Sequence, residues 1–298
     1  MATIEIGTGA PAPDVMDLTY AARFVEELGF ESVWMPDLVI GDGTPALEPA
    51  LALAAAAAAT ERVRIGFSVL VVPLRPAPWL AVQVATLQQL SGNRLLLGVG
   101  TGGFPGAPFW RALGVPGHDR GRITDETLRL LPQLLAGEPT AVVGGEPPLT
   151  LAPAVPMPPV LVGGTHRAFR RALDHGAGWF PSLVAPDDLA RSVTTLRDLA
   201  AERGVPVPEI TVGGHMVIGD DTEARSTYDA LVRNLVDVHG MPQEQAARTP
   251  MRARNAEELG EIFAAYASAG AARIVAGPDN GPWQTQLERV VEARDLLG

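Results

Sequence analysis

The sequence predicts an α/β fold, a single (β/α)8 TIM barrel over residues 1–298, with a short insertion before the fifth strand. Three observations support this prediction. Residues 67–103 show the pattern of a strand, a helix and a glycine-ended strand, the repeating unit of a parallel barrel. Eight such strand patterns alternate with helices along the chain. A chain of 298 residues with 47% hydrophobic content suffices for one barrel core, and no segment indicates a second. An open doubly wound sheet is the main alternative.

Four strands and three helices are expected in the first hundred residues. The segment 63–72 is apolar almost throughout, as a strand covered on both faces requires. Gly29 and Gly92 follow helical patterns and are typical of helix ends. The expected strands are 4–9, 32–35, 63–72 and 95–100, and the expected helices are 14–28, 49–60 and 79–90.

The second part of the chain is less regular but continues the alternation. Prolines and glycines over 139–158 exclude a helix there, so we expect a loop or a short hairpin near 141–151 as the insertion. The expected strands are 159–163, 178–181, 209–218 and 273–276. The expected helices are 121–135, 165–173, 187–203, 222–239, 252–270 and 283–297.

The composition excludes several classes of chemistry. The chain has no cysteine, which excludes disulfides, thiolate nucleophiles and thiolate metal sites. All 23 basic residues are arginine, which excludes Schiff-base lysines and lysine-bearing phosphate loops. No histidine pair has metal-ligand spacing, and no GxSxG motif occurs. We therefore expect neither a metal site nor a hydrolase nucleophile.

Charge and hydropathy indicate where the protein acts. The net charge of −11 argues against nucleic acid as a partner, because duplex binding depends on neutralising phosphates. No apolar segment is long enough to cross a bilayer, and the first residues resemble no signal peptide. These features predict a cytoplasmic protein that acts on a small molecule, without nucleic acid or membrane as partner.

Glycines dominate the positions that follow the expected strands, where barrel enzymes carry their sites. Glycine lets the backbone approach a flat ring or a phosphate closely. Gly163, Gly164 and Thr165 precede an expected helix, and such a segment offers amide donors to an anion. The alternative for each glycine is that it only turns the chain.

Four segments resemble the luciferase-like monooxygenase superfamily, which contains flavin-dependent luciferases and oxidoreductases that use the deazaflavin coenzyme F420. They are ELGFESVWMPD, ATERVRIGFSVLVVPLRPAP, LQQLSGNRLLLGVGTGG and PPVLVGGTHRAFRRALDHGAGWF, which match the family's strands two to six. In order and spacing these segments cover about two thirds of the chain. The remaining third fits by its barrel pattern alone.

The resemblance implies a cofactor ring at the barrel mouth, against a non-prolyl cis peptide between Ser68 and Val69. By position, Asp37 is expected to reach the ring, and Thr101 and Gly102 the ribityl chain or ring edge. Gly163, Gly164, Thr165 and His166 are expected to hold the phosphate. The structural alternatives are a helix cap for Asp37 and a strand-end hydrogen bond for Thr101.

Several arginines lie near these positions. Arg75 follows strand three and either neutralises a phosphate or pairs with Glu48, and we favour the pairing. A cluster after strand four either meets a polyanionic cofactor tail or is solvated at the surface, and we favour the surface role. Its members are Arg111, His118, Arg120 and Arg122.

Two departures from the family leave the catalytic residues unidentified. Leu38 stands where many members have a histidine, and Gly103 where deazaflavin sugar dehydrogenases have a carboxylate. Alcohol oxidation needs a base for the hydroxyl proton, so these losses weaken that activity and favour reduction of an activated double bond or oxygenation. His166 and His215 are the histidines expected near the mouth, and a packed role is favoured for His215.

The function that we expect is hydride transfer to or from a small organic substrate by an F420-dependent oxidoreductase. The alternatives are an FMN-dependent luciferase-like monooxygenase and a non-catalytic flavin-binding protein on the same fold. An apolar mouth formed by Phe67, Phe104, Phe109 and Trp110 argues for a substrate. The resemblance also implies a homodimer formed through the helices after strands two and three, and the alanine-rich segment 51–59 suits such packing.

Overall fold

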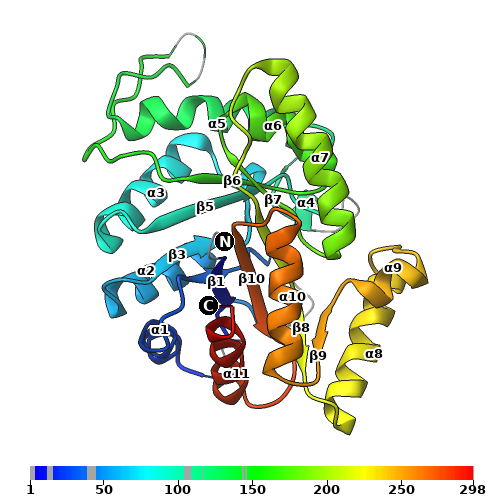
Figure 1. The fold of residues 1–298 in the computed structure, drawn as a ribbon. Helices are drawn as coiled ribbons and strands as arrows, with labels where there is room; N and C mark the ends of the chain where they lie inside the picture. Colours follow the sequence, from blue (N-terminus) through cyan, green and yellow to red (C-terminus); the bar gives the residue numbers. More distant parts are fainter. Residues whose placement is uncertain are drawn as a thin grey trace.

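Parallel strands curl into a barrel in the computed structural model, which describes residues 4–11, 16–38, 45–103, 109–115, 117–142, 144 and 146–297 (Figure 1). The strand order is β7-β6-β5-β3-β2-β1-β10-β8-β9, and β4 pairs with β5. Parallel bridges Trp179–Ile210 and Ser182–Gly213 link β7 to β8 and close the cylinder. The expected barrel is thereby confirmed against the open sheet. The strands are β1 (Glu5–Gly9), β2 (Ser32–Met35), β3 (Arg64–Phe67), β4 (Leu70–Val71), β5 (Leu95–Gly100), β6 (Val160–Gly163), β7 (Gly178–Phe180), β8 (Thr211–Ile218), β9 (Met251–Ala253) and β10 (Arg273–Pro278).

Helices cover the outside of the barrel, as Figure 1 shows for α1, α2, α3 and α11. Long helices begin where the sequence offers a cap or an N-terminal proline, such as Asp221 before α8 and Pro186 in α7. The helices are α1 (Leu18–Glu27), α2 (Pro49–Ala59), α3 (Ala77–Ser91), α4 (Phe109–Ala112), α5 (Arg120–Leu135), α6 (Phe169–Asp174), α7 (Pro186–Arg203), α8 (Thr222–Asp237), α9 (Gln243–Arg248), α10 (Ala256–Ser268) and α11 (Trp283–Asp295), with short 3-10 turns η1 (Val72–Leu74) and η2 (His166–Ala168).

The observed elements differ from the expected ones at several places. The expected strand 63–72 is split into β3 and β4. The expected helix 252–270 begins only at Ala256, because residues 251–253 form β9 beside β8 and Asn255 caps α10. The described residues within 141–151 belong to no helix or strand, and the hairpin expected near them is limited to one antiparallel bridge between Thr140 and Leu149. The short helices α4 and α9 were not expected.

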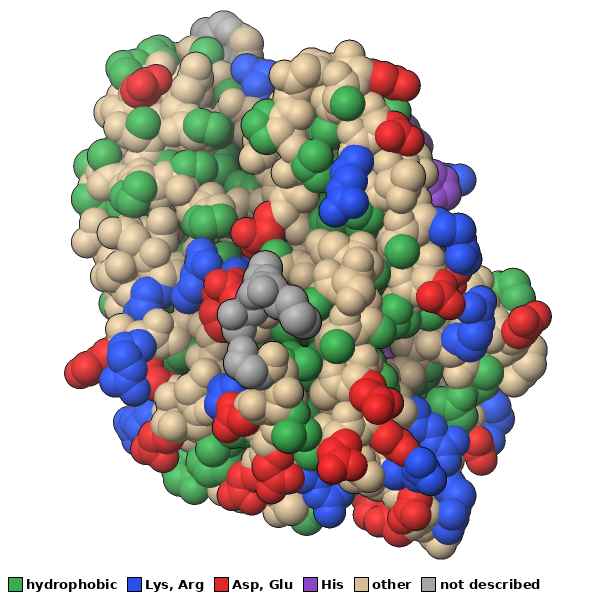
Figure 2. Space-filling model, viewed as in Figure 1, with side chains coloured by type: hydrophobic (Ala, Val, Ile, Leu, Met, Phe, Trp, Pro, Cys, Tyr) green, Lys and Arg blue, Asp and Glu red, His purple; other side chains and the backbone are tan. Residues whose placement is uncertain are grey.

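Exposed hydrophobic side chains lie on α2 and α3. Leu51 on α2 is 74% exposed, and Trp79 on α3 is 59% exposed. Val82 and Leu90 on α3 are exposed as well. Hydrophobic side chains also gather on the left of Figure 2, where α3 lies in Figure 1.

The interior of the barrel is filled in its middle. Trp34 is fully buried there, and Phe180 packs edge-on against it with ring centroids 5.2 Å apart. A Cβ atom at Gly66 would lie 2.3 Å from the Trp34 ring, so glycine at this position makes room for the indole. The layer consists of Trp34, Leu96, Leu161, Phe180 and Val275, with Val69 packed against it.

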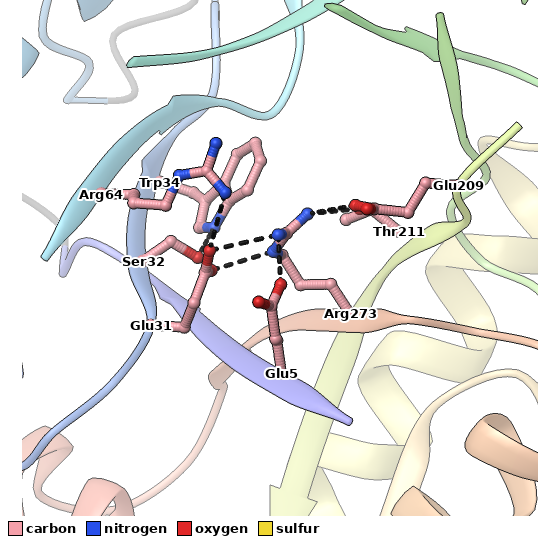
Figure 3. A network of polar contacts seen from close by, with 8 residues as sticks. All are labelled: Glu5, Glu31, Ser32, Trp34, Arg64, Glu209, Thr211 and Arg273. Carbon is pink, nitrogen blue, oxygen red and sulfur yellow. Dashed lines mark hydrogen bonds and ion pairs between the residues drawn. The ribbon is translucent and has the colours of Figure 1, made fainter. Parts of the chain in front are cut away.

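An ion cluster closes the barrel at the amino-terminal ends of the strands (Figure 3). Arg273 is 2% exposed and pairs with Glu5, with Glu31 at 2.9 Å and with Glu209 at 3.0 Å. Arg64 adds a second cation, 3.3 Å from Glu31. The larger open space of the barrel lies at the opposite end, at the carboxyl ends of the strands.

Candidate active site

A non-prolyl cis peptide joins Ser68 to Val69 in the gap between β3 and β4, at the position expected from the sequence. Glycines on the neighbouring strands leave space for Val69. A Cβ atom at Gly100 would lie 2.8 Å from Val69 Cγ2, and one at Gly163 would lie 3.0 Å from Val69 Cγ1. A Cβ atom at Gly98 would lie 1.9 Å from the carbonyl oxygen of Phe67. These glycines therefore accommodate the backbone and side chain at the cis peptide.

A cavity of about 710 Å³ opens at the carboxyl ends of the strands. Its volume suits a small organic molecule or a cofactor ring. It reaches from Ser68 and Val69 across the barrel mouth to His215 and Asp279. Much of its wall is backbone, because seven of its lining residues are glycines: Gly9, Gly163, Gly164, Gly213, Gly214, Gly277 and Gly281.

Glycine enlarges this cavity on the β1 side. A Cβ atom at Gly9 would meet no atom within 4 Å, so a side chain there would project into open space. A Cβ atom at Gly277 would also have space, since its nearest neighbours would be backbone atoms of Gly9 at 3.8 Å. A flat ring system fits a mouth with walls of this kind, because backbone can approach it closely.

The β8 and β10 side of the cavity is polar. His215 Nδ1 lies 3.0 Å from Asp279 Oδ1, and the other carboxylate oxygen accepts a hydrogen bond from Met216 N at 2.9 Å. The hydrogen bond to Asp279 raises the pKa of His215 above its ordinary 6.5, against the opposing effect of burial. Asn280 bonds both the N–H and the carbonyl of Ile218 at 3.0 Å. These contacts hold the loop after β10 against the end of β8.

The expected site residues divide between the cavity wall and its surroundings. Ser68, Val69, Gly163 and Gly164 line the cavity. The other expected residues do not line it: Asp37, Thr101, Gly102, Thr165 and His166.

Asp37 is 8% exposed and links the end of β2 to β4. Its carboxylate accepts from Val71 N at 2.8 Å and from Arg75 at 2.6 Å. Its partners are therefore not the first residues of a following helix, as a helix cap would require. Val71 and Arg75 lie 34 and 38 residues further along the chain. Arg75 also pairs with Glu48 at 2.9 Å, which confirms the expected pairing and adds Asp37 to it.

Thr101 and Gly102 begin a loop that packs against Trp110. A Cβ atom at Gly102, where φ is +76°, would lie 2.6 Å from the Trp110 ring. Arg120 lies over that ring, 4.6 Å from its centroid, and donates to Gly102 O at 2.9 Å. Of the arginine cluster expected after strand four, Arg120 thus stabilises this loop. Arg122 is exposed and pairs with Asp119 and Glu126.

The apolar mouth expected from four aromatic residues is not formed by Phe67 and Trp110. Their exposed fractions are 1% and 3%, so both belong to the core. Phe109 is half-buried and packs on Trp110, with ring centroids 4.8 Å apart. Phe104 lies outside the described residues. The apolar contacts of the observed cavity come instead from Val69, Phe180, Leu183, Val275 and Trp283.

The segment expected to hold a phosphate follows β6. Gly164 has φ +124°, and its carbonyl accepts from Trp179 Nε1 at 2.8 Å. Thr165 and His166 are exposed, and the turn η2 begins at His166.

In the part of the chain that the structure describes, no three His, Asp or Glu side chains are grouped to bind a metal ion. None of the described helices is long and apolar enough to cross a membrane.

The pairing of His215 with Asp279 was not predicted from the sequence. Their contact depends on the β8–β10 register, which sets Gly277 opposite His215. Glu223 was not predicted either; it lines the cavity and accepts a hydrogen bond from Gly281 N at 2.9 Å. The only signal in the sequence was the group of polar residues that follows the expected strand 273–276, which is β10 in the structure.

The chain is similar in sequence to one protein family and to a mycobacterial protein. A family model described as luciferase-like monooxygenase matches residues 1–298. An uncharacterized protein of Mycobacterium tuberculosis is 30% identical over 260 residues, covering 78% of this chain and 89% of its own.

Two solved structures share the fold. An F420-dependent secondary alcohol dehydrogenase in complex with an F420–acetone adduct has a TM-score of 0.81 at 19% identity, with 99% of each chain covered. The oxygenating constituent of 3,6-diketocamphane monooxygenase from Pseudomonas putida, in complex with FMN, has a TM-score of 0.74 at 16% identity and covers 99% of this chain and 96% of its own. At these identities the likeness concerns the fold.

Proposed function

Because the chain belongs to the luciferase-like monooxygenase family, we propose that it is an oxidoreductase that uses coenzyme F420 for hydride transfer to or from a small organic substrate. The observation that carries this proposal is the glycine-walled cavity of about 710 Å³ between the cis peptide and the His215–Asp279 pair. Its residues fit a flat redox ring, since a ring can rest on Val69 while the glycines leave its faces accessible.

Residues on both walls have a role in this proposal. Ser68 and Val69 support the ring, and the segment from Gly163 to His166, whose first two residues line the cavity, holds the phosphate. When bound, the reduced cofactor supplies a hydride. Asp37 holds β4 in place beside the ring through its bonds to Val71 N and Arg75. Thr101 and Gly102 form the loop next to it, which Arg120 holds.

The substrate that suits this cavity is small and not strongly anionic. Two carboxylates, Asp279 and Glu223, face the cavity, and no arginine belongs to the described lining. Negative charge in the substrate would therefore meet two carboxylates, with no arginine of the described lining to neutralise it. Enones and aldehydes satisfy this requirement.

An FMN-dependent monooxygenase is the second candidate. It is supported by the description of the matching family and by the FMN-bound structure that shares the fold. A non-catalytic flavin-binding protein is the third, because Leu38 and Gly103 replace two groups with which relatives carry out chemistry.

Titration of the purified protein with F420 and, separately, with FMN tests these candidates, with cofactor fluorescence as the readout. We expect F420 to bind more tightly, and the loaded protein to reduce members of an enone and aldehyde panel. Preference for FMN with oxygen consumption supports the second candidate. Binding without turnover across the panel supports the third.

A cavity-filling variant shows where the cofactor binds. We expect Gly9→Leu to weaken F420 binding at least about tenfold, because the added side chain enters open cavity space. Gly117→Leu is the matched control. Gly117 is exposed, and a Cβ atom there would likewise meet no atom within 4 Å. Equal affinity in both variants would place the cofactor elsewhere.

We also propose that the protein is a homodimer that buries the exposed faces of α2 and α3. The exposure of Leu51 and Trp79, at 74% and 59%, supports this surface. Light scattering after size exclusion is expected to give twice the 31.3 kDa chain mass, and Leu51→Glu with Trp79→Glu to give the single mass. A single mass for the unmodified protein contradicts the dimer.

A further inference from the structure

The polar wall of the cavity contains a histidine–carboxylate pair for which the proposed function has so far given no role. His215 on β8 and Asp279 after β10 both line the cavity, with Nδ1 and Oδ1 3.0 Å apart. The His215 side chain is 40% exposed, so its ring is open to the cavity. Because Asp279 occupies Nδ1, the ring nitrogen left for a ligand is Nε2.

We propose that His215 is the residue that gives a proton to the substrate or takes one from it, and that Asp279 is a positioning residue that fixes the tautomer and orientation of the imidazole. This inference rests on the proposed function, since it concerns the same cavity. It supplies the group that Leu38 and Gly103 do not provide.

The surroundings of Asp279 make it a rigid support. One carboxylate oxygen accepts from Met216 N at 2.9 Å, and Asp279 N donates to Met216 O at 2.8 Å. The next residue, Asn280, is bonded to both backbone groups of Ile218. The carboxylate is thus held on the strand that carries His215, which is how a supporting carboxylate orients a catalytic imidazole.

The charges near His215 favour its protonated form. Asp279 faces it from the β10 side, and Glu223 on α8 is the other carboxylate in the cavity lining. On β9, which pairs with the end of β8, Arg252 lies over the Tyr228 ring instead, 4.4 Å from its centroid. On β7, the described lining residue Phe180 is uncharged. Glu223 accepts a hydrogen bond from Gly281 N.

The proton balance of the reaction defines the role. Reduction of an enone or aldehyde adds one hydride and one proton to the substrate. The Nε2–H bond of protonated His215 breaks, the proton bonds to the carbonyl oxygen or to the α-carbon, and the imidazole becomes neutral. Solvent then protonates His215 again. In the direction of oxidation, neutral Nε2 accepts the proton as the hydride leaves.

The pairing is tested first in the cofactor-free protein by NMR titration of the histidine side chains. The His215 signal is identified as the one missing from His215→Gln. We expect its midpoint above 6.5 in the unmodified protein, and a fall to 6.5 or below in Asp279→Asn, which keeps an acceptor for Met216 N but removes the charge. An unchanged midpoint in Asp279→Asn overturns the proposal.

Cofactor binding and turnover test the catalytic role separately. We expect His215→Gln to bind the cofactor within about threefold of the unmodified protein, while kcat for 2-cyclohexen-1-one or benzaldehyde falls about 100-fold or more. Asp279→Asn is expected to shift the pH profile of kcat toward lower pH. His215→Gln with normal turnover overturns the proposal, and so does an unmodified protein that binds cofactor but reduces neither compound. Failure of the unmodified protein to bind any cofactor overturns the proposed function instead, and leaves the NMR result to decide whether the pair exists.

Discussion

At the scale of single residues, glycines on the barrel strands make room for neighbouring side chains. Gly66 accommodates Trp34, Gly100 accommodates Val69, and Gly102 accommodates Trp110. At these positions the space that the missing Cβ leaves is filled by protein atoms. At Gly9 it is not filled, and there the space belongs to the cavity.

We expect Gly66→Ala to lower the free energy of unfolding by about 1–3 kcal/mol, because its Cβ would lie 2.3–2.6 Å from atoms of the fully buried Trp34 ring. Urea denaturation followed by tryptophan fluorescence measures the change. Gly9→Ala is the control, and its Cβ meets nothing within 4 Å, so we expect a change within about 0.5 kcal/mol. Equal effects of the two substitutions would contradict this account of Gly66.

At the scale of elements, single carboxylates join strands and helices that are distant in the sequence. Asp37 connects β2 to β4, and Glu26 connects α1 to the segment that enters β3. The Glu26 carboxylate accepts from Arg62 N at 2.6 Å and from Val63 N at 2.8 Å, and also from Glu61 N. Burial raises the pKa of Glu26, but these backbone donors outweigh it and hold the pKa below its ordinary 4.5.

We expect Glu26→Gln to lower the free energy of unfolding at pH 7 by about 1.5–3 kcal/mol, since it weakens charge-assisted hydrogen bonds. The pKa in the folded state is depressed, so the stabilisation is present above 4.5 and is lost as pH falls through the depressed value. The difference between the two proteins should therefore shrink in acid. Denaturation curves over this pH range measure it.

The control for this substitution is Glu126→Gln. Glu126 belongs to an exposed pair with Arg122, one turn away on α5. We expect a change of about 0.5 kcal/mol or less. A difference between Glu26→Gln and the unmodified protein that stays constant down to the acid transition would contradict the assigned role of the carboxylate.

At the scale of the whole molecule, the two ends of the barrel have opposite characters. The amino-terminal end is closed by Arg273 and its glutamates, which begin or precede β1, β2, β8 and β10 (Figure 3). The carboxyl end holds the open cavity. Stability and ligand binding are therefore assigned to different ends, as is usual in barrels.

We expect Arg273→Ala to lower the free energy of unfolding by about 3–5 kcal/mol, because three carboxylates would lose their buried partner. Chemical denaturation measures this loss, and F420 affinity of the folded variant should be unchanged. Arg122→Ala, at an exposed pair, should change stability by less than about 1 kcal/mol. A similar small effect of Arg273→Ala would show that the cluster does not hold the barrel together.

The sequence predicted most of the fold but only part of the candidate site. Residues 32–35 and 95–100 were predicted with the observed bounds, because short apolar runs bounded by glycine or proline define buried strands locally. The expected helix 252–270 is observed as α10, but its expected start at Arg252 was wrong, since pairing with β8 holds residues 251–253 in a strand. The cis peptide was correctly placed by resemblance, whereas the aromatic mouth was wrong because Phe67 and Trp110 face the core.

The sequence by itself determined the alternation of strands and helices, the family and the position of the cis peptide, since each is carried by neighbouring residues. The tertiary structure alone decided that Asp37 binds Arg75 and Val71, and that His215 meets Asp279. The last two residues are separated by 64 positions, and their contact depends on the register of β8 against β10. The physical reason is that local patterns fix which face a side chain takes, while partners across a barrel depend on how distant strands align.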